Sequence, residues 1–208
     1  QHGQSGLWVS TLLPEIATCA DDLCVIRSLH TEGQAHGEAS LRMHTGASNL
    51  VRPSVGSWVT YGLGTENESL PGFVTISPLR AHGGVQNYSS AFLPAAYQGM
   101  QIRDTGSPIV DLKPPADRTP DQQREWLRFL HDLNEKHIDQ NPFDTELSAR
   151  VHSYELAFRM QSHAPDAIDL SKETEATRKL YGVGEKPTDY FGRQLLMARR
   201  LVERGVRY

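Results

Sequence analysis

Short apolar runs alternate with helical patterns over the first 77 residues. Residues 23–26 and 73–76 are largely apolar runs of four, a pattern typical of strands that are buried on both faces. A helix beginning at Pro14 precedes the first run, and helices are predicted over residues 38–44 and 53–61 between the two runs. This order predicts an α/β fold with a mainly parallel sheet covered by helices, in which the two runs are neighbouring or near-neighbouring strands.

The second half of the chain reads differently. Glycine, proline, serine and asparagine are scattered through residues 78–118, which we interpret as an irregular surface excursion. Residues 119–165 then carry two capped helical patterns, so we expect a helical hairpin packed beside the sheet, with Trp126 and Phe158 mostly buried.

Residues 166–208 are expected to return to the core. Ser171 is predicted to cap a short helix and Thr188 to begin the last one. The final Val206, Arg207 and Tyr208 have the apolar and β-favouring character of a strand's first residues. We therefore expect residues 1–208 to be one partial domain that is truncated at a strand.

Composition narrows the function only slightly. The chain has 208 residues with 21 Lys and Arg against 25 Asp and Glu, a formal net charge of −4, which does not indicate nucleic-acid binding. No apolar run reaches the roughly 20 residues of a membrane-spanning helix. Of the two cysteines, Cys24 lies in an apolar run and is predicted to be a core residue.

Candidate chemistry centres on two histidines that follow the first predicted strand. His30 and His36 flank one short loop, and loops at the carboxyl ends of strands carry the reactive groups of open α/β sheets. An imidazole there can bind a metal ion, relay a proton or attack phosphorus. The spacing alone is equally typical of ordinary loop histidines whose nitrogens bond to backbone carbonyls.

Many separate blocks of the chain resemble the bacterial family called domain of unknown function 1501. The blocks include His2-Gly3-Gln4-Ser5-Gly6, Asp22-Leu23-Cys24-Val25-Ile26-Arg27-Ser28, His30-Thr31-Glu32, Arg52-Pro53-Ser54, Gly56-Ser57-Trp58-Val59, Tyr61-Gly62-Leu63-Gly64 and Ala198-Arg199-Arg200-Leu201. The family is related to arylsulfatases and alkaline phosphatases. The resemblance implies a three-layer α/β/α fold of alkaline phosphatase type, here incomplete, and export to the periplasm or the cell exterior.

The resemblance also suggests roles for individual residues. The segment from His36 to Thr45-Gly46 matches the sulfatase nucleophile segment in length and in its Thr-Gly close, and His36 falls at the nucleophile position. The Cys or Ser that becomes formylglycine is absent, so His36 is assigned first as metal ligand or acid/base, with nucleophile as the alternative. The resemblance further implies His30 as a metal ligand, and Thr45 and Arg52 as substrate-binding residues.

Two functions follow from the resemblance. The first is a metal-dependent hydrolase of sulfate or phosphate esters, using zinc or calcium and acting on a small molecule or a polysaccharide. Most of the family's metal ligands fall outside residues 1–208, so we expect these residues to be inactive alone. The alternative is a non-catalytic exported binding or scaffold protein with the same fold.

Overall fold

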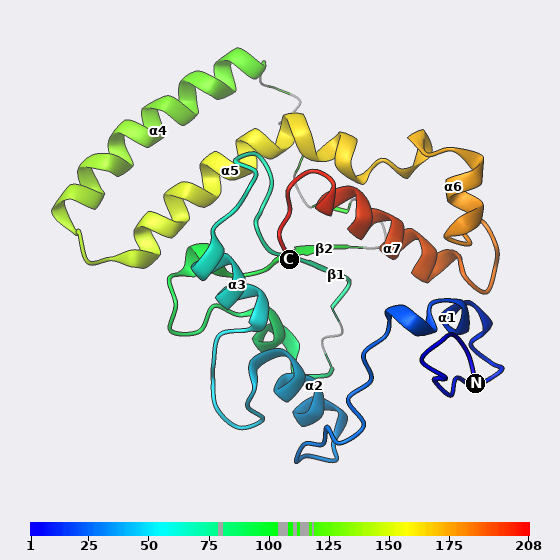
Figure 1. The fold of residues 1–208 in the computed structure, drawn as a ribbon. Helices are drawn as coiled ribbons and strands as arrows, with labels where there is room; N and C mark the ends of the chain where they lie inside the picture. Colours follow the sequence, from blue (N-terminus) through cyan, green and yellow to red (C-terminus); the bar gives the residue numbers. More distant parts are fainter. Residues whose placement is uncertain (79–80, 104–107, 110–111, 113–116, 118) are drawn as a thin grey trace. The chain divides into compact units, whose positions relative to one another are not determined.

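The computed structural model describes residues 1–78, 81–103, 108–109, 112, 117 and 119–208 (Figure 1). The chain divides into two compact units, Gln1–Glu32 and Gly33–Tyr208. Along the chain the elements are α1 (Pro14–Thr18), η1 (Ala20–Asp22), α2 (His36–Thr45), α3 (Val55–Leu63), β1 (Val74–Ile76), η2 (Gly84–Tyr88), η3 (Ala95–Tyr97), β2 (Met100–Ile102), α4 (Pro120–Gln140), α5 (Thr145–Ile168), η4 (Leu170–Lys172), α6 (Glu175–Leu180) and α7 (Asp189–Val202).

In the first unit, one carboxylate joins the segment near the N-terminus to η1. Asp21 accepts hydrogen bonds from the backbone N–H of Ser5 at 2.8 Å and of Gln4 at 2.9 Å. These bonds, that from Ser5 contributing most, lower the pKa of Asp21 below its usual value. The same contact explains Gly3, because a Cβ there would lie 2.3 Å from the Asp21 carboxylate.

The strand predicted over residues 23–26 is wrong. This segment has no regular secondary structure, and its apolar side chains are exposed, Ile26 to 64%. Cys24, predicted to be a core residue, is also exposed. A strand needs a backbone partner, and the bridge within residues 1–32 joins His2 to Leu7 instead. Residues 23–26 therefore have no strand partner within residues 1–32.

The second predicted strand is confirmed, with a different neighbour. β1 pairs in parallel with β2, in a register that places Val74 opposite Met100 and Ile76 opposite Ile102. β2 lies within residues 78–118, which were predicted to be irregular. Its three residues are too few to show the alternation of apolar and polar positions by which a strand is recognised in a sequence. A two-stranded sheet in the described residues does not test the three-layer fold, which stays a prediction.

The end of the chain runs along the other edge of β1. The Tyr208 N–H donates to the Gly72 carbonyl at 3.1 Å, and the Val74 N–H donates to the Tyr208 carbonyl at 2.9 Å. Bonds that alternate between the two segments in this way are those of a parallel pair. The strand-like character predicted for the last residues thus agrees with their hydrogen bonding.

α2 and α3 lie close to their predicted positions. Gly46 ends α2 with a φ of 74°, and the Ser54 hydroxyl caps the start of α3 by accepting from the Ser57 N–H. α3 approaches β1 and the chain end at Gly56, where a Cβ would lie 2.5 Å from the Phe73 ring and 2.6 Å from the Tyr208 ring.

Two glycines of α3 should respond in opposite ways to alanine. We expect Gly56→Ala to lower the free energy of unfolding by about 1–3 kcal/mol, because two packed rings would have to move. Gly62→Ala is the matched control, since no atom of the described residues lies within 4 Å of its added Cβ. It should raise the free energy by about 0.5–1 kcal/mol. Urea unfolding measures both, and equal effects would contradict the close packing at Gly56.

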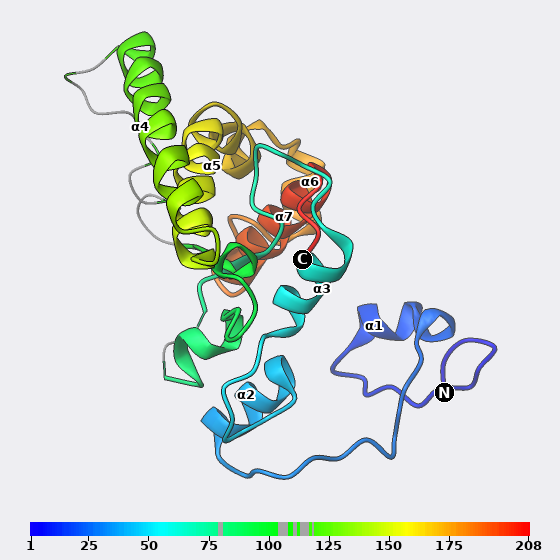
Figure 2. The ribbon, with the colours of Figure 1, turned by 90° about the vertical axis from the view of Figure 1, so that its left-hand side faces the viewer.

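The helical hairpin is confirmed. α4 and α5 run antiparallel and side by side in both views (Figures 1 and 2). Thr119 and Gln122 form a capping box at the start of α4, and the Asp144 carboxylate caps α5. Trp126 is 53% exposed, so its predicted burial is wrong, and Phe158 is half-buried. Among the described elements α4 packs mainly against α5, and most of its residues are exposed.

The core of the second unit lies where α5 and α7 meet the sheet. Fully buried residues come from all three, among them Ala167, Leu196 and Ile102. α6 begins at a cap supplied by Thr174 instead of the predicted Ser171. The Ser171 hydroxyl donates to the Asp169 carboxylate at 2.6 Å.

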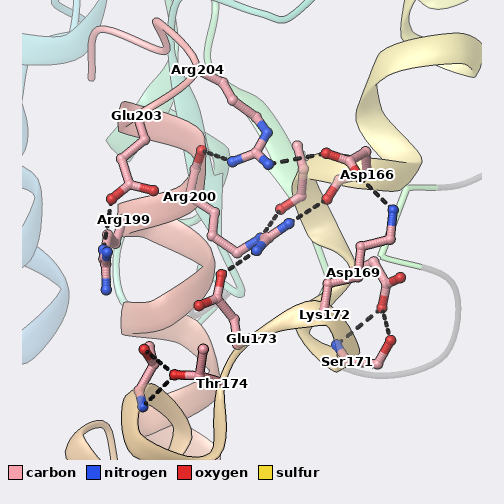
Figure 3. Close-up of polar contacts among 12 residues, drawn as sticks. Asp166, Asp169, Ser171, Lys172, Glu173, Thr174, Arg199, Arg200, Glu203 and Arg204 are labelled. Carbon is pink, nitrogen blue, oxygen red and sulfur yellow. Dashed lines mark hydrogen bonds and ion pairs between the residues drawn. The ribbon is translucent and has the colours of Figure 1, made fainter.

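Hydrogen bonds and ion pairs of charged side chains join the end of α5 to α7 (Figure 3). Arg200, buried on α7, donates to the carbonyls of Asp166 at 2.7 Å and Ala167 at 3.0 Å, and pairs with the Glu173 carboxylate. The Asp166 carboxylate lies 2.5 Å from Lys172 Nζ and 3.0 Å from the Arg204 guanidinium. The last carbonyls of α5 thus receive their hydrogen bonds from α7.

Asp166 should make stability depend on pH in the acid range. Hydrogen bonds from Lys172 and then Arg204 lower the pKa of Asp166 from 3.8 to about 2. The contribution of Asp166 to the free energy of unfolding is therefore present above the pKa of the unfolded chain, and it is lost as the pH falls from about 4 towards 2. The stability difference between the parent and Asp166→Asn, measured by urea unfolding, should shrink over that window. A difference that stays constant would contradict the pairing.

Candidate functional site

The candidate site lies where α2 meets the segment that follows β1. α2 packs against η2, and its residues His36, Ser40 and His44 share one face because they are four residues apart. The His36 ring stacks on the His82 ring, with centroids 5.3 Å apart and planes inclined by 25°. Two imidazoles from segments 46 residues apart in the sequence therefore meet.

The backbones of the two segments approach each other at glycines. A Cβ on Gly37 would lie 3.9 Å from the Gly83 backbone nitrogen, so the start of α2 lies against the turn that carries His82. Gly83 has a φ of 88°, and a Cβ there would lie 2.7 Å from the Asn87 amide oxygen. The Asn87 amide nitrogen in turn donates to the His82 carbonyl at 2.5 Å, which fixes the turn.

A cavity of about 370 Å³ adjoins this pair. It runs along β1 to the residues at its carboxyl end, and its lining includes His82, His44, Ser40, Thr75 and Asn87. The carboxyl end of parallel strands is the usual place for ligands in open α/β sheets. The volume is within the roughly 300–1,000 Å³ typical of small-molecule sites.

Two lining residues carry buried polar atoms for which the described residues provide no hydrogen-bond partner. They are the hydroxyl oxygen of Thr75 and the amide oxygen of Asn87. The hydroxyl of Ser77, directly after β1, is a third such atom, and Ser77 has a strained φ of 46°. Unpaired buried polar atoms are rare in folded proteins, and backbone strain at a non-glycine residue is commonest at functional sites.

The predicted site residues lie in different surroundings. His36 is brought to His82, whereas His30 belongs to the first unit, is exposed, and has its Nδ1 3.4 Å from the Ser28 carbonyl. The shared metal role of His30 and His36 stays a prediction. Within the described parts of the chain, no three His, Cys, Asp or Glu side chains gather closely enough to hold a metal ion.

Thr45 and Arg52, predicted to bind substrate, also stay predictions. The Thr45 hydroxyl lies 2.8 Å from the Leu41 carbonyl and 3.0 Å from the Ala47 carbonyl, and it accepts from the Ala47 N–H at 3.3 Å. These contacts close the end of α2. Arg52 is exposed in the segment before the Ser54 cap.

Sequence reasoning missed His82. It lies in the segment read as an irregular excursion, with no motif around it, and its partner is 46 residues away. The only available signal is its place shortly after a predicted strand, as for His36.

A second, larger cavity of about 1010 Å³ lies between η3, the residues before β1 and α5. Its lining includes Tyr97, Gln98, Arg150 and Ser153, and none of the predicted site residues. Phe73 lines both cavities. In the part of the chain that the structure describes, no helix is both long and apolar enough to cross a bilayer.

Comparison with known proteins supports the family resemblance. A family model described as "Protein of unknown function (DUF1501)" matches residues 1–208. No curated protein and no solved structure shows a significant match to the chain. The family match covers every residue of the chain, which therefore belongs to the DUF1501 family of proteins of unknown function.

Proposed function

We propose that this protein hydrolyses sulfate or phosphate esters, with His36 as the acid/base residue. The observation that carries the proposal is the stacked pair of His36 and His82 beside a cavity at the carboxyl end of β1. The ester class comes from the relation to sulfatases that the family resemblance implies. The same relation makes export to the periplasm or beyond part of the proposal.

The reaction requires one proton to be moved. Water adds to sulfur or phosphorus, the bond to the alcohol oxygen breaks, and a proton passes from the water to the departing alkoxide. An imidazole changes its charge near neutral pH, which makes His36 suited to carry that proton. Stacking on His82 restricts the plane of the His36 ring and so positions its nitrogens.

The start of α2 is also suited to the anionic ester group. His36, Gly37 and Glu38 form the first turn, where helical N–H groups have no partner within the helix. Such groups, together with the helix dipole, favour sulfate or phosphate oxygens. The negative group and His36 would then meet at the same helix end.

A divalent metal ion, zinc or calcium, belongs to the proposal as the group that would neutralise the ester's charge. The donor set observed at the site is two imidazoles, and a metal site ordinarily needs three or four ligands. The described residues thus do not fit a complete metal site, and no step of the reaction is derived through a metal.

The proposal is tested with the natural protein that contains this chain. Released sulfate or phosphate is measured over a panel of aryl and sugar sulfates and phosphates, with zinc or calcium supplied. Turnover of at least one ester class is expected. A folded protein that binds members of the panel but hydrolyses none would instead be the non-catalytic binding protein.

A further inference from the structure

We propose that the 370 Å³ cavity beside β1 binds the alcohol part of the substrate, and that this part is a neutral polyhydroxylated ring such as a sugar. The inference rests on the proposed ester hydrolysis and deepens it by naming the substrate class. It is carried by the two unpaired polar atoms of Thr75 and Asn87 and by the charge of the cavity lining.

The unpaired atoms indicate a ligand with at least one hydrogen-bond donor and a second hydrogen-bonding group. The Asn87 amide oxygen only accepts hydrogen bonds, so its missing partner has to be a donor. The Thr75 hydroxyl both donates and accepts, and a ligand hydroxyl satisfies either need. Burying such atoms without partners is costly, and a ligand that pairs with both removes that cost.

The lining indicates that the ligand part is neutral. No Asp, Glu, Lys or Arg lines this cavity among the described residues, and the two imidazoles that do, of His44 and His82, carry no permanent charge. A permanently charged ligand part buried there would therefore have no permanent opposite charge beside it. The anionic sulfate or phosphate group therefore stays outside, at the start of α2, while the neutral alcohol part enters.

Aromatic side chains supply part of the remaining lining. Phe73, Tyr88 and Tyr208 line the cavity, and the rings of Phe73 and Tyr208 lie edge to face with centroids 5.3 Å apart. The C–H faces of a sugar ring are apolar and pack against aromatic rings, while its hydroxyl groups point outward to polar atoms. One cavity thus offers both kinds of contact that a sugar ring makes.

The test uses neutral probes, so that binding is measured apart from hydrolysis. Methyl glucoside, methyl galactoside and methyl mannoside are titrated into the natural protein by calorimetry, with methoxycyclohexane as the matched ring without hydroxyls. At least one glycoside should bind, and more tightly than methoxycyclohexane. Thr75→Val should weaken that glycoside about threefold to tenfold, the usual effect of one hydrogen bond.

Two further variants sharpen the result. Thr31→Val, an exposed threonine that does not line the cavity, should leave glycoside binding unchanged. Asn87→Leu should weaken binding as Thr75→Val does, but it also removes the bond to the His82 carbonyl and can unfold the turn. Thr75→Val avoids that difficulty, because its hydroxyl has no partner to lose and the melting temperature should not fall.

The outcomes separate this inference from the hydrolase. If no glycoside binds more tightly than methoxycyclohexane, or Thr75→Val does not weaken the glycoside, the sugar subsite is overturned whether or not esters are hydrolysed. If glycosides bind as expected while the ester panel shows no turnover, the subsite is supported and the hydrolase is not.

Discussion

Replacing Arg200 with methionine is expected to lower the free energy of unfolding by about 3–5 kcal/mol, the usual cost of removing one partner of a buried ion pair. Arg200 is 5% exposed, and the side chain of its partner Glu173 is 16% exposed. The substitution leaves that partly buried carboxylate without its charge partner. It also leaves the carbonyls of Asp166 and Ala167 without the donors that Figure 3 shows.

The neighbouring arginine is the control. Arg199 lies on the same helix, but its exposed side chain pairs with Glu203, four residues along and away from the buried cluster (Figure 3). Arg199→Met should change the free energy of unfolding by no more than about 0.5 kcal/mol, as exposed helical pairs do. Urea unfolding followed by circular dichroism measures both variants.

A second variant tests the reason for the effect. In Arg200→Met with Glu173→Leu, both charges are replaced by apolar groups, and most of the lost stability should return. If the single and double variants were equally destabilised, the loss would come from the unpaired carbonyls and not from the buried carboxylate.

Replacing His36 with alanine is expected to reduce ester hydrolysis by the natural protein about 10²-fold or more, the scale for losing a positioned acid/base group. The fold should remain intact, because His36 is an exposed residue at the first position of α2. The effect should appear mainly in kcat, since the proton is transferred in the reaction step and not on binding.

Other histidines serve as comparisons for His36. His82→Ala should also lower kcat, because it removes the ring on which His36 stacks. His137→Ala, at an exposed position near the end of α4, should leave kcat unchanged. If His36→Ala kept full activity and changed only the melting temperature, His36 would be structural, and Ser40 and Thr45 would be the next residues to test.

Where local chemistry decides the structure, the sequence predicted it well. The caps at Thr119 and Asp144, and the glycine end of α2 at Gly46, follow from side chains and φ values that act within one helical turn, although the cap predicted at Ser171 is supplied by Thr174 instead. Such interactions do not depend on the rest of the fold, so the helical hairpin could be placed from the sequence alone. Membership of the DUF1501 family could likewise be predicted from the sequence, because the resemblance rests on short blocks of consecutive residues.

What the sequence could not decide was which backbones pair and which side chains meet. Residues 23–26 and 73–76 are both short and apolar, yet only the second run became a strand, because its backbone pairs with Met100–Ile102 and with the chain end. The predicted burial of Trp126 was wrong for a similar reason, because a helical face is buried only where another element covers it.

The candidate site depended most on the tertiary structure. Sequence selected His36 from its place after an apolar run, but its stacking partner His82 and the unpaired atoms of Thr75 and Asn87 come from segments 39 to 51 residues further along the chain. Their meeting is produced by the packing of α2 on η2 and by the course of β1. Contacts between distant segments leave no local pattern in the sequence, and for that physical reason only the folded chain reveals them.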